Sequence, residues 1–332
     1  MRKPVSVFVA VMMGIALLFG NAALGSAADK PIVLKAASFL PYHPGGRFDN
    51  AVDYCKRVTE RSKGALVVKF LGGGETIPGP RQVQAVRSGV LDISWTAASF
   101  YARLLPETLC FSASELSAAE ERSVGFYDYI NGLHKKLGLV YLGRNRGDGF
   151  YWASNKLIKD PHQDFKGLKF AVIGTFWNSF SKKLNIIPVN VPIPERYTAL
   201  ERGVVDGVGV AGVGAAALGT GEVTKYYIDH AFLTGGSGST IMNLKSWNSL
   251  PKHLQDLLMA EFINYEKELP NYWAGKIEKE RSILKKQGMA FIKFSPADAD
   301  WYVKTANDAK WEEVKAAVPD AYPKLKDMLT KK

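Results

Sequence analysis

The chain has 332 residues, 47% of them hydrophobic, which is enough for two domains that each bury a core. Its formal net charge is +11, but the basic residues alternate with apolar and acidic ones, so we interpret the charge as a solvated surface and expect no nucleic-acid partner. With two cysteines and five scattered histidines, the chain offers no cluster for a zinc-type site, and we expect no cofactor.

The first 28 residues have the pattern of a secretory signal peptide. Arg2 and Lys3 precede the apolar run Val5–Leu18, which is too short to span a bilayer comfortably, and Ser26 and Ala28 form a small-residue cleavage pattern. The alternative is a membrane anchor. We predict a mature chain that begins near Asp29 and is located in the periplasm.

Strand and helix patterns alternate over the first part of the chain. Strands are predicted at Pro31–Ser38, Ala65–Phe70 and Leu91–Trp95, with helices between them that carry Cys55 and end near Arg87. This β-α-β-α-β order predicts a parallel sheet.

Cys55 shares one face of its predicted helix with Phe48, Val52 and Val58, which favours a role as a small buried apolar residue. The alternative is a disulfide with Cys110, which an oxidising compartment permits.

A second α/β half follows. After a largely helical Ser112–Leu139, strands are predicted at Val140–Leu142, Phe150–Ala153, Lys169–Ile173 and Ile187–Val191.

The region from Pro251 to Gln287 is mostly helical, since Leu254, Leu258 and other apolar residues follow one face. Pro270 is expected to kink this helix.

Gly207, Gly209 and Gly212 formally match the dinucleotide-binding fingerprint. The match lies in the second half of the chain and lacks the strand–helix context that the fingerprint requires. We therefore predict that these glycines let the backbone pass close to a neighbouring helix or ligand.

The segment Ile193–Gly207 reads IPERYTALERGVVDG. Tyr197 and Leu200 lie on one helical face, Gly203 fits a left-handed helix cap, and Val204 and Val205 are expected to open a strand. The ordered pattern of Glu195, Tyr197, Ala199, Leu200, Gly203, Val205, Asp206 and Gly207 resembles the motif of the solute-binding proteins of tripartite ATP-independent periplasmic (TRAP) transporters. The resemblance covers essentially the whole mature chain.

This resemblance implies a two-lobed α/β periplasmic binding protein fold with interleaved domains and a long helix that spans the hinge. It implies a protein without enzymatic activity that captures a small organic solute by hinge closure and delivers it to membrane-embedded TRAP permease subunits. We expect a monomer. The competing class, a secreted enzyme that uses the same cleft, lacks a Gly-x-Ser-x-Gly elbow or a catalytic carboxylate pair in this sequence.

The expected organisation has lobe I at residues 29–150, with return segments from about 235–270, and lobe II at 151–234, with part of the C-terminal region. The connecting helix is expected at 251–287 and a C-terminal segment at 288–332.

Three positions depart from the family pattern. Where relatives carry a carboxylate-binding arginine, this chain has Ala171, and Phe150 or Tyr151 replaces a second arginine. Val210 lies in the strand where the family often has an asparagine. Without a fork-shaped guanidinium, a buried carboxylate loses its best partner.

Two hypotheses follow. Either the solute's acid group is held by Arg144, Arg146 or His43, or the solute is largely apolar, aromatic or cationic and packs on aromatic rings. The alternative role for each aromatic residue is to fill a domain core. The residues expected to line the cleft are Tyr42, His43, Glu75, Trp95, Phe100, Arg146, Phe150, Trp152, Ala171, Phe176, Trp177 and Val210.

Overall fold

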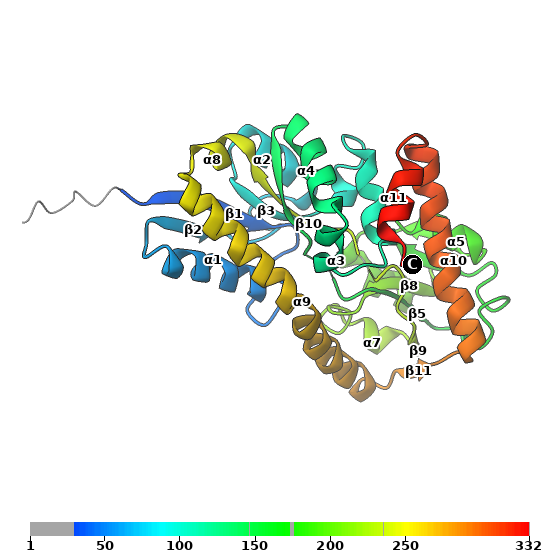
Figure 1. Cartoon of the computed structure of the whole chain (residues 1–332). Helices are drawn as coiled ribbons and strands as arrows, with labels where there is room; N and C mark the ends of the chain where they lie inside the picture. Colours follow the sequence, from blue (N-terminus) through cyan, green and yellow to red (C-terminus); the bar gives the residue numbers. More distant parts are fainter. Residues whose placement is uncertain (1–29, 146, 173–175, 235, 332) are drawn as a thin grey trace, which may run out of the picture.

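The computed structural model describes residues 30–331 except residues 146, 173–175 and 235. The predicted signal peptide and Arg146 therefore lie outside the described residues. The described chain forms two β-sheets, each covered by helices (Figure 1).

The first sheet has the strand order β2-β1-β3-β10-β4. Its strands are β1 (Ile32–Ser38), β2 (Leu66–Phe70), β3 (Ile93–Ala97), β4 (Leu139–Gly143) and β10 (Gly238–Asn243). The predicted parallel arrangement is confirmed for β1, β2 and β3. The sheet as a whole is mixed, because β10 returns from a much later part of the chain and lies antiparallel to β3 and β4.

The second sheet has the order β11-β9-β5-β8-β6-β7. Its strands are β5 (Phe150–Ser154), β6 (Lys169–Val172), β7 (Ile187–Asn190), β8 (Gly207–Ala211), β9 (Tyr226–Ile228) and β11 (Ala290–Ile292). Strand β6 is parallel to β7 and β8, whereas β5 is antiparallel to β8. The chain therefore moves between the two sheets more than once.

The helices predicted around Cys55, up to Arg87, over Ser112–Leu139 and from Pro251 are present, and the structure adds others in the second half of the chain, including a long one near the C-terminus. Together the helices are α1 (Asp49–Arg61), α2 (Gly79–Ser88), η1 (Ala98–Phe100), η2 (Pro106–Ala113), α3 (Ala118–Ser123), α4 (Phe126–Lys136), α5 (Asn178–Lys183), η3 (Ile193–Glu195), α6 (Arg196–Glu201), α7 (Thr220–Val223), α8 (Leu244–Ser249), α9 (Lys252–Lys286), α10 (Pro296–Ala317) and α11 (Tyr322–Leu329).

The prediction that Val204 and Val205 open a strand was wrong. Gly203 takes the predicted left-handed conformation, with a φ of 68°. The amides of Val204 and Val205 then bond back to the carbonyl of Ala199, so these residues close the end of α6. Strand β8 begins only at Gly207.

Helix α9 runs along both sheets (Figure 1). Residues from Leu254 to Trp273 pack in the core of the first sheet, and Leu284 packs in the core of the second. The helix is continuous through Pro270. The expected long connecting helix is therefore present.

Cys55 and Cys110 are buried and free. Cys55 packs with α1 on one face of the first sheet, whereas Cys110 belongs to the core on the opposite face. The sheet thus separates the two thiols, and the buried apolar role predicted for Cys55 is confirmed.

The predicted close approach to a neighbouring helix is confirmed for Gly209, which faces Trp177 at the start of α5, whereas Gly207 approaches Phe170 of the adjacent strand β6. A Cβ atom at Gly207 would lie 2.4 Å from the ring of Phe170, and one at Gly209 would lie 2.7 Å from the ring of Trp177. The segment fits tight packing against aromatic rings rather than a phosphate-binding turn.

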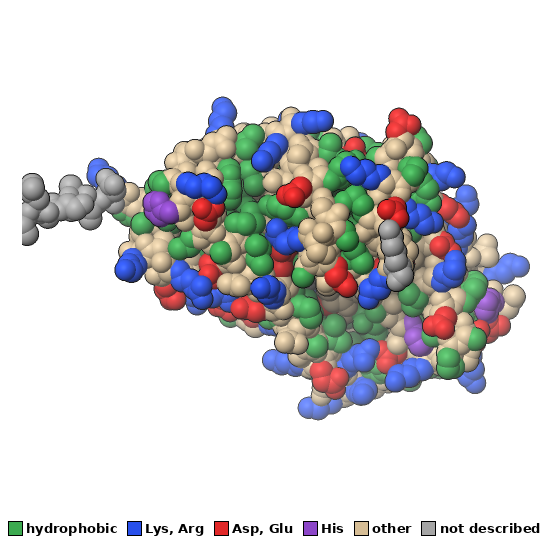
Figure 2. All heavy atoms as spheres, viewed as in Figure 1, with side chains coloured by type: hydrophobic (Ala, Val, Ile, Leu, Met, Phe, Trp, Pro, Cys, Tyr) green, Lys and Arg blue, Asp and Glu red, His purple; other side chains and the backbone are tan. Residues whose placement is uncertain are grey.

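Basic and acidic side chains are interspersed over the face seen in Figure 2, as expected for a solvated surface. Among the described residues, no helix combines the length and the apolar character needed to cross a membrane.

Candidate functional site

Each sheet has a crevice between two neighbouring parallel strands whose following connections run to opposite sides of the sheet. In the first sheet, the chain after β1 continues to β2 on one side, and the chain after β3 continues to the other side. In the second sheet, β6 leads to β7 and β8 leads towards β9. Ligands of open α/β sheets bind outside the carboxyl ends of such strands.

The two crevices face each other. Ser99, which follows β3, and Phe176, which follows β6, line the same cavity. At another point, Arg47 from the loop after β1 donates a hydrogen bond of 2.8 Å to the carbonyl of Val213, just after β8. The candidate site is therefore the space between the two sheets, at the carboxyl ends of their parallel strands.

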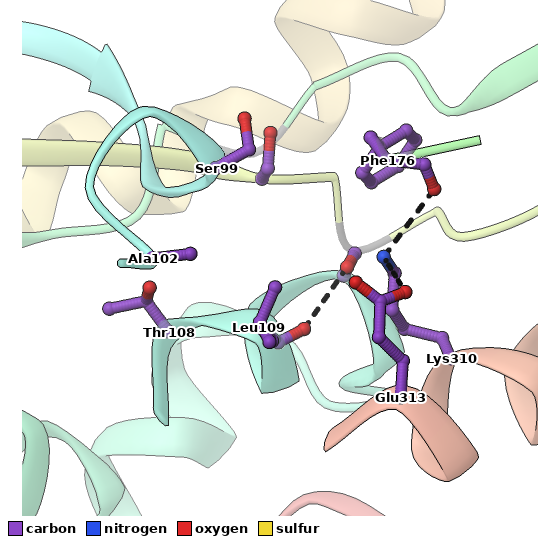
Figure 3. A pocket seen from close by; sticks show the side chains of 9 residues that line it. Ser99, Ala102, Thr108, Leu109, Phe176, Lys310 and Glu313 are labelled. Atoms are coloured by element: carbon purple, nitrogen blue, oxygen red, sulfur yellow. Dashed lines mark hydrogen bonds and ion pairs between the residues drawn. The ribbon is translucent and has the colours of Figure 1, made fainter. Parts of the chain in front are cut away.

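The cavity has a volume of about 40 Å³. Its lining comes from η1, η2, α10 and the segments after β6 and before β10, and comprises Ser99, Ala102, Thr108, Leu109, Ser112, Phe176, Ser237, Lys310 and Glu313. Figure 3 shows Phe176 and the α10 side chains around this space. A volume of this size holds a few water molecules.

Lys310 is a buried cation at the cavity wall. Its Nζ donates hydrogen bonds to the Glu313 carboxylate (2.8 Å) and to the carbonyl oxygen of Phe176 (3.4 Å), as drawn in Figure 3. The ammonium also lies 4.7 Å from the centre of the Phe176 ring. Burial lowers the pKa of Lys310, because the charged form loses hydration. The sequence interpretation did not include Lys310, since α10 is far from β6 along the chain.

The structure brings four predicted site residues into one aromatic group. The ring of Phe150 lies 4.5 Å from that of Phe176 and 5.2 Å from that of Trp177, and Trp152 lies 4.9 Å from Trp177. Phe150 and Phe176 are half-buried, whereas Trp152 and Trp177 are buried in the core beside α5. The aromatic group therefore offers two partly accessible rings.

Ala171 and Val210 lie on the opposite face of the second sheet. They pack with Tyr151 in one buried cluster, next to Leu200 of α6 and Val191. Strand alternation explains the division, because neighbouring residues such as Phe170 and Ala171 point to opposite faces. Ala171, Tyr151 and Val210, which depart from the family pattern, thus lie together. They lie on the face opposite the aromatic group.

Trp95 lies in the core of the first sheet, fully buried against Tyr54 at a ring distance of 5.6 Å. Its strand β3 is buried along its whole length. This placement corresponds to the core-filling role named as the alternative. Phe100 is 38% exposed and lies 5.6 Å from Phe39, at the carboxyl end of β3.

Tyr42, His43 and Glu75 lie together at the edge of the first sheet. The Glu75 carboxylate accepts hydrogen bonds from the backbone amides of Gly73 (2.6 Å) and Tyr42 (3.1 Å). These bonds contribute to a lowered pKa for Glu75, against a raising effect of burial. Tyr42 is half-buried and His43 is exposed. Glu75 therefore ties two loops together in the described structure.

Arg144 is buried inside the first half of the molecule. Its Nη2 donates to the carbonyls of Phe111 (2.8 Å) and Gly236 (3.2 Å), and its Nη1 lies 3.7 Å from the Glu121 carboxylate. The guanidinium is thus engaged by the protein itself.

Arg196 is a second buried arginine, at the start of α6. Its Nη1 donates to the carbonyl of Gly209 in β8 (2.9 Å) and its Nε to the carbonyl of Val191 (3.3 Å). The sequence interpretation passed over it, although it lies inside the quoted motif. Its spacing of four residues from Leu200 was a signal of burial, because both residues lie on one helical face.

An ion pair lies beside Val213, at the point where the two crevices meet. Arg47 forms two hydrogen bonds with the Asp148 carboxylate, of 2.7 and 2.8 Å. Asp148 also accepts a hydrogen bond from the amide of Val213. The Arg47 guanidinium stacks 4.9 Å from the ring of Trp273 in α9. In the described part of the chain, no group of three or more His, Cys, Asp or Glu side chains is arranged to hold a metal ion.

The sequence profile described as bacterial extracellular solute-binding protein, family 7 (DctP), matches residues 47–316. The chain belongs to this family. By its description, the family consists of bacterial extracellular solute-binding proteins.

A monocarboxylate 2-oxoacid-binding periplasmic protein of Nostoc sp. is 26% identical over 226 residues, which are 64% of this chain and 60% of that protein. An uncharacterised protein of Haemophilus influenzae is 32% identical over 165 residues, 48% of each chain. The chain thus spans about half to three fifths of the length of these relatives.

Solved structures of TRAP solute-binding proteins share the two-lobed fold. The protein from Desulfovibrio salexigens with bound orotic acid is 19% identical and has a TM-score of 0.76, over 90% of this chain and 97% of its own. The protein from Bordetella bronchiseptica with calcium and picolinate is 22% identical, with a TM-score of 0.73 over 91% of this chain and 92% of its own. At these identities the likeness establishes the fold.

Proposed function

We propose that this DctP-family protein captures a small organic acid with an aromatic or apolar body between its two lobes, in the periplasm, and delivers it to TRAP permease subunits. The observation that carries the proposal is the half-buried pair Phe150 and Phe176, of which Phe176 lines the space between the two crevices beside the ion pair of Lys310 and Glu313. Flat apolar rings suit a solute with a flat or apolar body.

The relatives support an acid as the solute. Their bound molecules include orotic acid, picolinate and malonate. We further propose the lobe boundaries given above, cleavage near Asp29 and a monomeric state.

The proposed mechanism is hinge closure. A cavity of about 40 Å³ is far smaller than the roughly 300 Å³ at the lower end of small-molecule sites. The solute therefore needs the lobes to separate before it binds and favours their closed arrangement afterwards.

The test is a thermal-unfolding screen of the mature protein with orotate, picolinate, pyruvate and malonate, each beside its neutral amide. A solute at 100 times its dissociation constant should add roughly 2.7 kcal/mol of stability. We expect stabilisation by an acid with a ring or apolar body, less by malonate, and no chemical conversion of the acid. Stabilisation by the neutral amides alone, or conversion of the acid, would contradict the proposal.

A further inference from the structure

Arg196 is a buried cation for which the described residues provide no carboxylate. The residue is 7% exposed, and its hydrogen-bond partners among the described residues are two backbone carbonyls. Its Nη2 is buried without a hydrogen-bond partner among the described residues. Burial lowers the pKa of Arg196 to about 10, because nothing nearby compensates the lost hydration.

The position of Arg196 coincides with the crevice of the second sheet. Helices α5 and α6 cover opposite faces of this sheet, as shown by Phe180 in one core and Leu200 in the other. The Arg196 guanidinium spans from Val191, which follows β7, to Gly209 in β8. Because β6 lies between β7 and β8, the guanidinium lies at the carboxyl end of β6, where the crevice opens.

The first sheet provides an internal comparison, because its helix α2 occupies the corresponding place between β2 and β3. Gln82 of α2 is fully buried and donates to the carbonyls of Ser38 (2.7 Å) and Ile77 (2.8 Å). Its Oε1 accepts a hydrogen bond from the Ser94 hydroxyl (2.7 Å). A neutral amide therefore suffices to join these elements in the first sheet. In the second sheet the corresponding residue is the charged Arg196, and its Nη2 has no hydrogen-bond partner among the described residues.

Arg196 also reaches the same face as Ala171. Ala171 pairs with Val208 of β8 and Val189 of β7, and it packs in the cluster that contains Val191. Alanine leaves this face without a charge of its own. Arg196 supplies one from the neighbouring helix.

We propose that Arg196 binds the acid group of the solute, through Nη2, at the carboxyl end of β6. This inference rests on the proposed function, because it assumes that the solute is an organic acid. In this assignment the Arg196 guanidinium takes the place of an arginine at position 171.

The test is titration calorimetry with picolinate, orotate, pyruvate and malonate on wild type, Arg196→Met, Arg196→Lys and the control Arg202→Met. Arg202 is exposed at the end of the same helix, so its replacement removes the same charge without touching the crevice. Circular dichroism and thermal unfolding of each variant establish that it is folded.

We expect the acid that binds wild type to bind Arg196→Met at least about 30-fold more weakly, since one partner of a buried charge pair is lost. Arg196→Lys retains the charge without the planar fork and should lie between the two. Arg202→Met should bind as wild type does. Neutral picolinamide should bind wild type and Arg196→Met with similar affinity.

Equal affinity of a folded Arg196→Met or Arg196→Lys for the acid would overturn the assignment and leave the proposed function standing. A wild-type protein that binds none of the four acids would instead overturn the proposed function, and the assignment with it. If Arg196→Met fails to fold, Arg196→Lys decides, because undiminished binding by that variant contradicts a fork-specific contact.

Discussion

At the scale of single residues, Gly209 determines how closely β8 approaches the aromatic group. A Cβ atom there would meet three atoms of the Trp177 ring at 2.7 to 2.9 Å. Trp177 is buried and bounded by Trp152 and Phe150, so its ring has little room to move. The absence of a side chain at position 209 therefore sets the position of one wall of the candidate site.

We predict that Gly209→Ala lowers the free energy of unfolding by about 1–3 kcal/mol, as overpacking of a buried site does. Urea unfolding measures the change. Gly132→Ala is the matched control, because Gly132 lies in α4 and an added Cβ would have no neighbour within 4 Å. The control should be neutral or slightly stabilising. Equal stability of Gly209→Ala and wild type would show that the Trp177 ring moves freely.

At the scale of elements, a buried hydrogen-bond chain joins η1, α4 and β10. The Tyr101 hydroxyl lies 3.0 Å from His134 Nε2 and 3.0 Å from the Ser239 hydroxyl, and His134 Nδ1 lies 2.7 Å from the carbonyl of Ile130. A carbonyl only accepts, so Nδ1 carries the proton. In the neutral ring Nε2 accepts from Tyr101, which accepts from Ser239. The chain thus satisfies both ring nitrogens of a neutral His134.

Burial lowers the pKa of His134 from 6.5 to about 4. The unfolded chain therefore binds the proton more readily than the folded protein, and His134 contributes stability above pH 6.5 that is lost as the pH falls towards 4. We predict that wild type loses about 3 kcal/mol more than His134→Gln over this interval, measured by urea unfolding at a series of pH values.

His253→Gln is the control for this pH dependence, because His253 is exposed on α9. It should follow the wild-type curve. If the curves of wild type and His134→Gln run parallel between pH 6.5 and 4, His134 is not kept neutral in the folded protein.

At the scale of the whole molecule, Arg47 and Asp148 together hold Val213, which follows β8, by hydrogen bonds to its carbonyl and from its amide. Arg47 belongs to the loop after β1, and its partners include the carbonyl of Val213 after β8. The Val213 side chain also packs against the core of the first sheet. Separation of the lobes at this point would break these contacts, so they favour the closed arrangement.

We predict that Arg47→Met shifts the balance towards the open arrangement by about 2 kcal/mol, or about 30-fold. The radius of gyration of the solute-free protein, measured by small-angle scattering, should increase. Arg57→Met is the control, since Arg57 pairs with Glu261 and Glu268 between α1 and α9, both on the first sheet's side. An unchanged radius of gyration for Arg47→Met would show that the pair of Arg47 and Asp148 stabilises the protein only locally.

The sequence by itself determined the family and the kinds of elements. The ordered motif from Glu195 to Gly207 identified the TRAP resemblance, and alternation and helical periodicity placed the strands and the long α9. These signals are local, because they depend on the period of side chains along one element. The glycines of β8 were also recognised as points of close approach from their own positions.

Only the tertiary structure decided which side chains meet. Trp95 and Phe150 are both aromatic residues in predicted strands, yet one lies in a core and the other in the half-buried aromatic group. Lys310 reaches Phe176 from α10, and Arg196 reaches Gly209 across β6. Such contacts depend on strand order and on which face each helix covers, and no period along the chain encodes either. The charge of the candidate site is therefore a property of the fold.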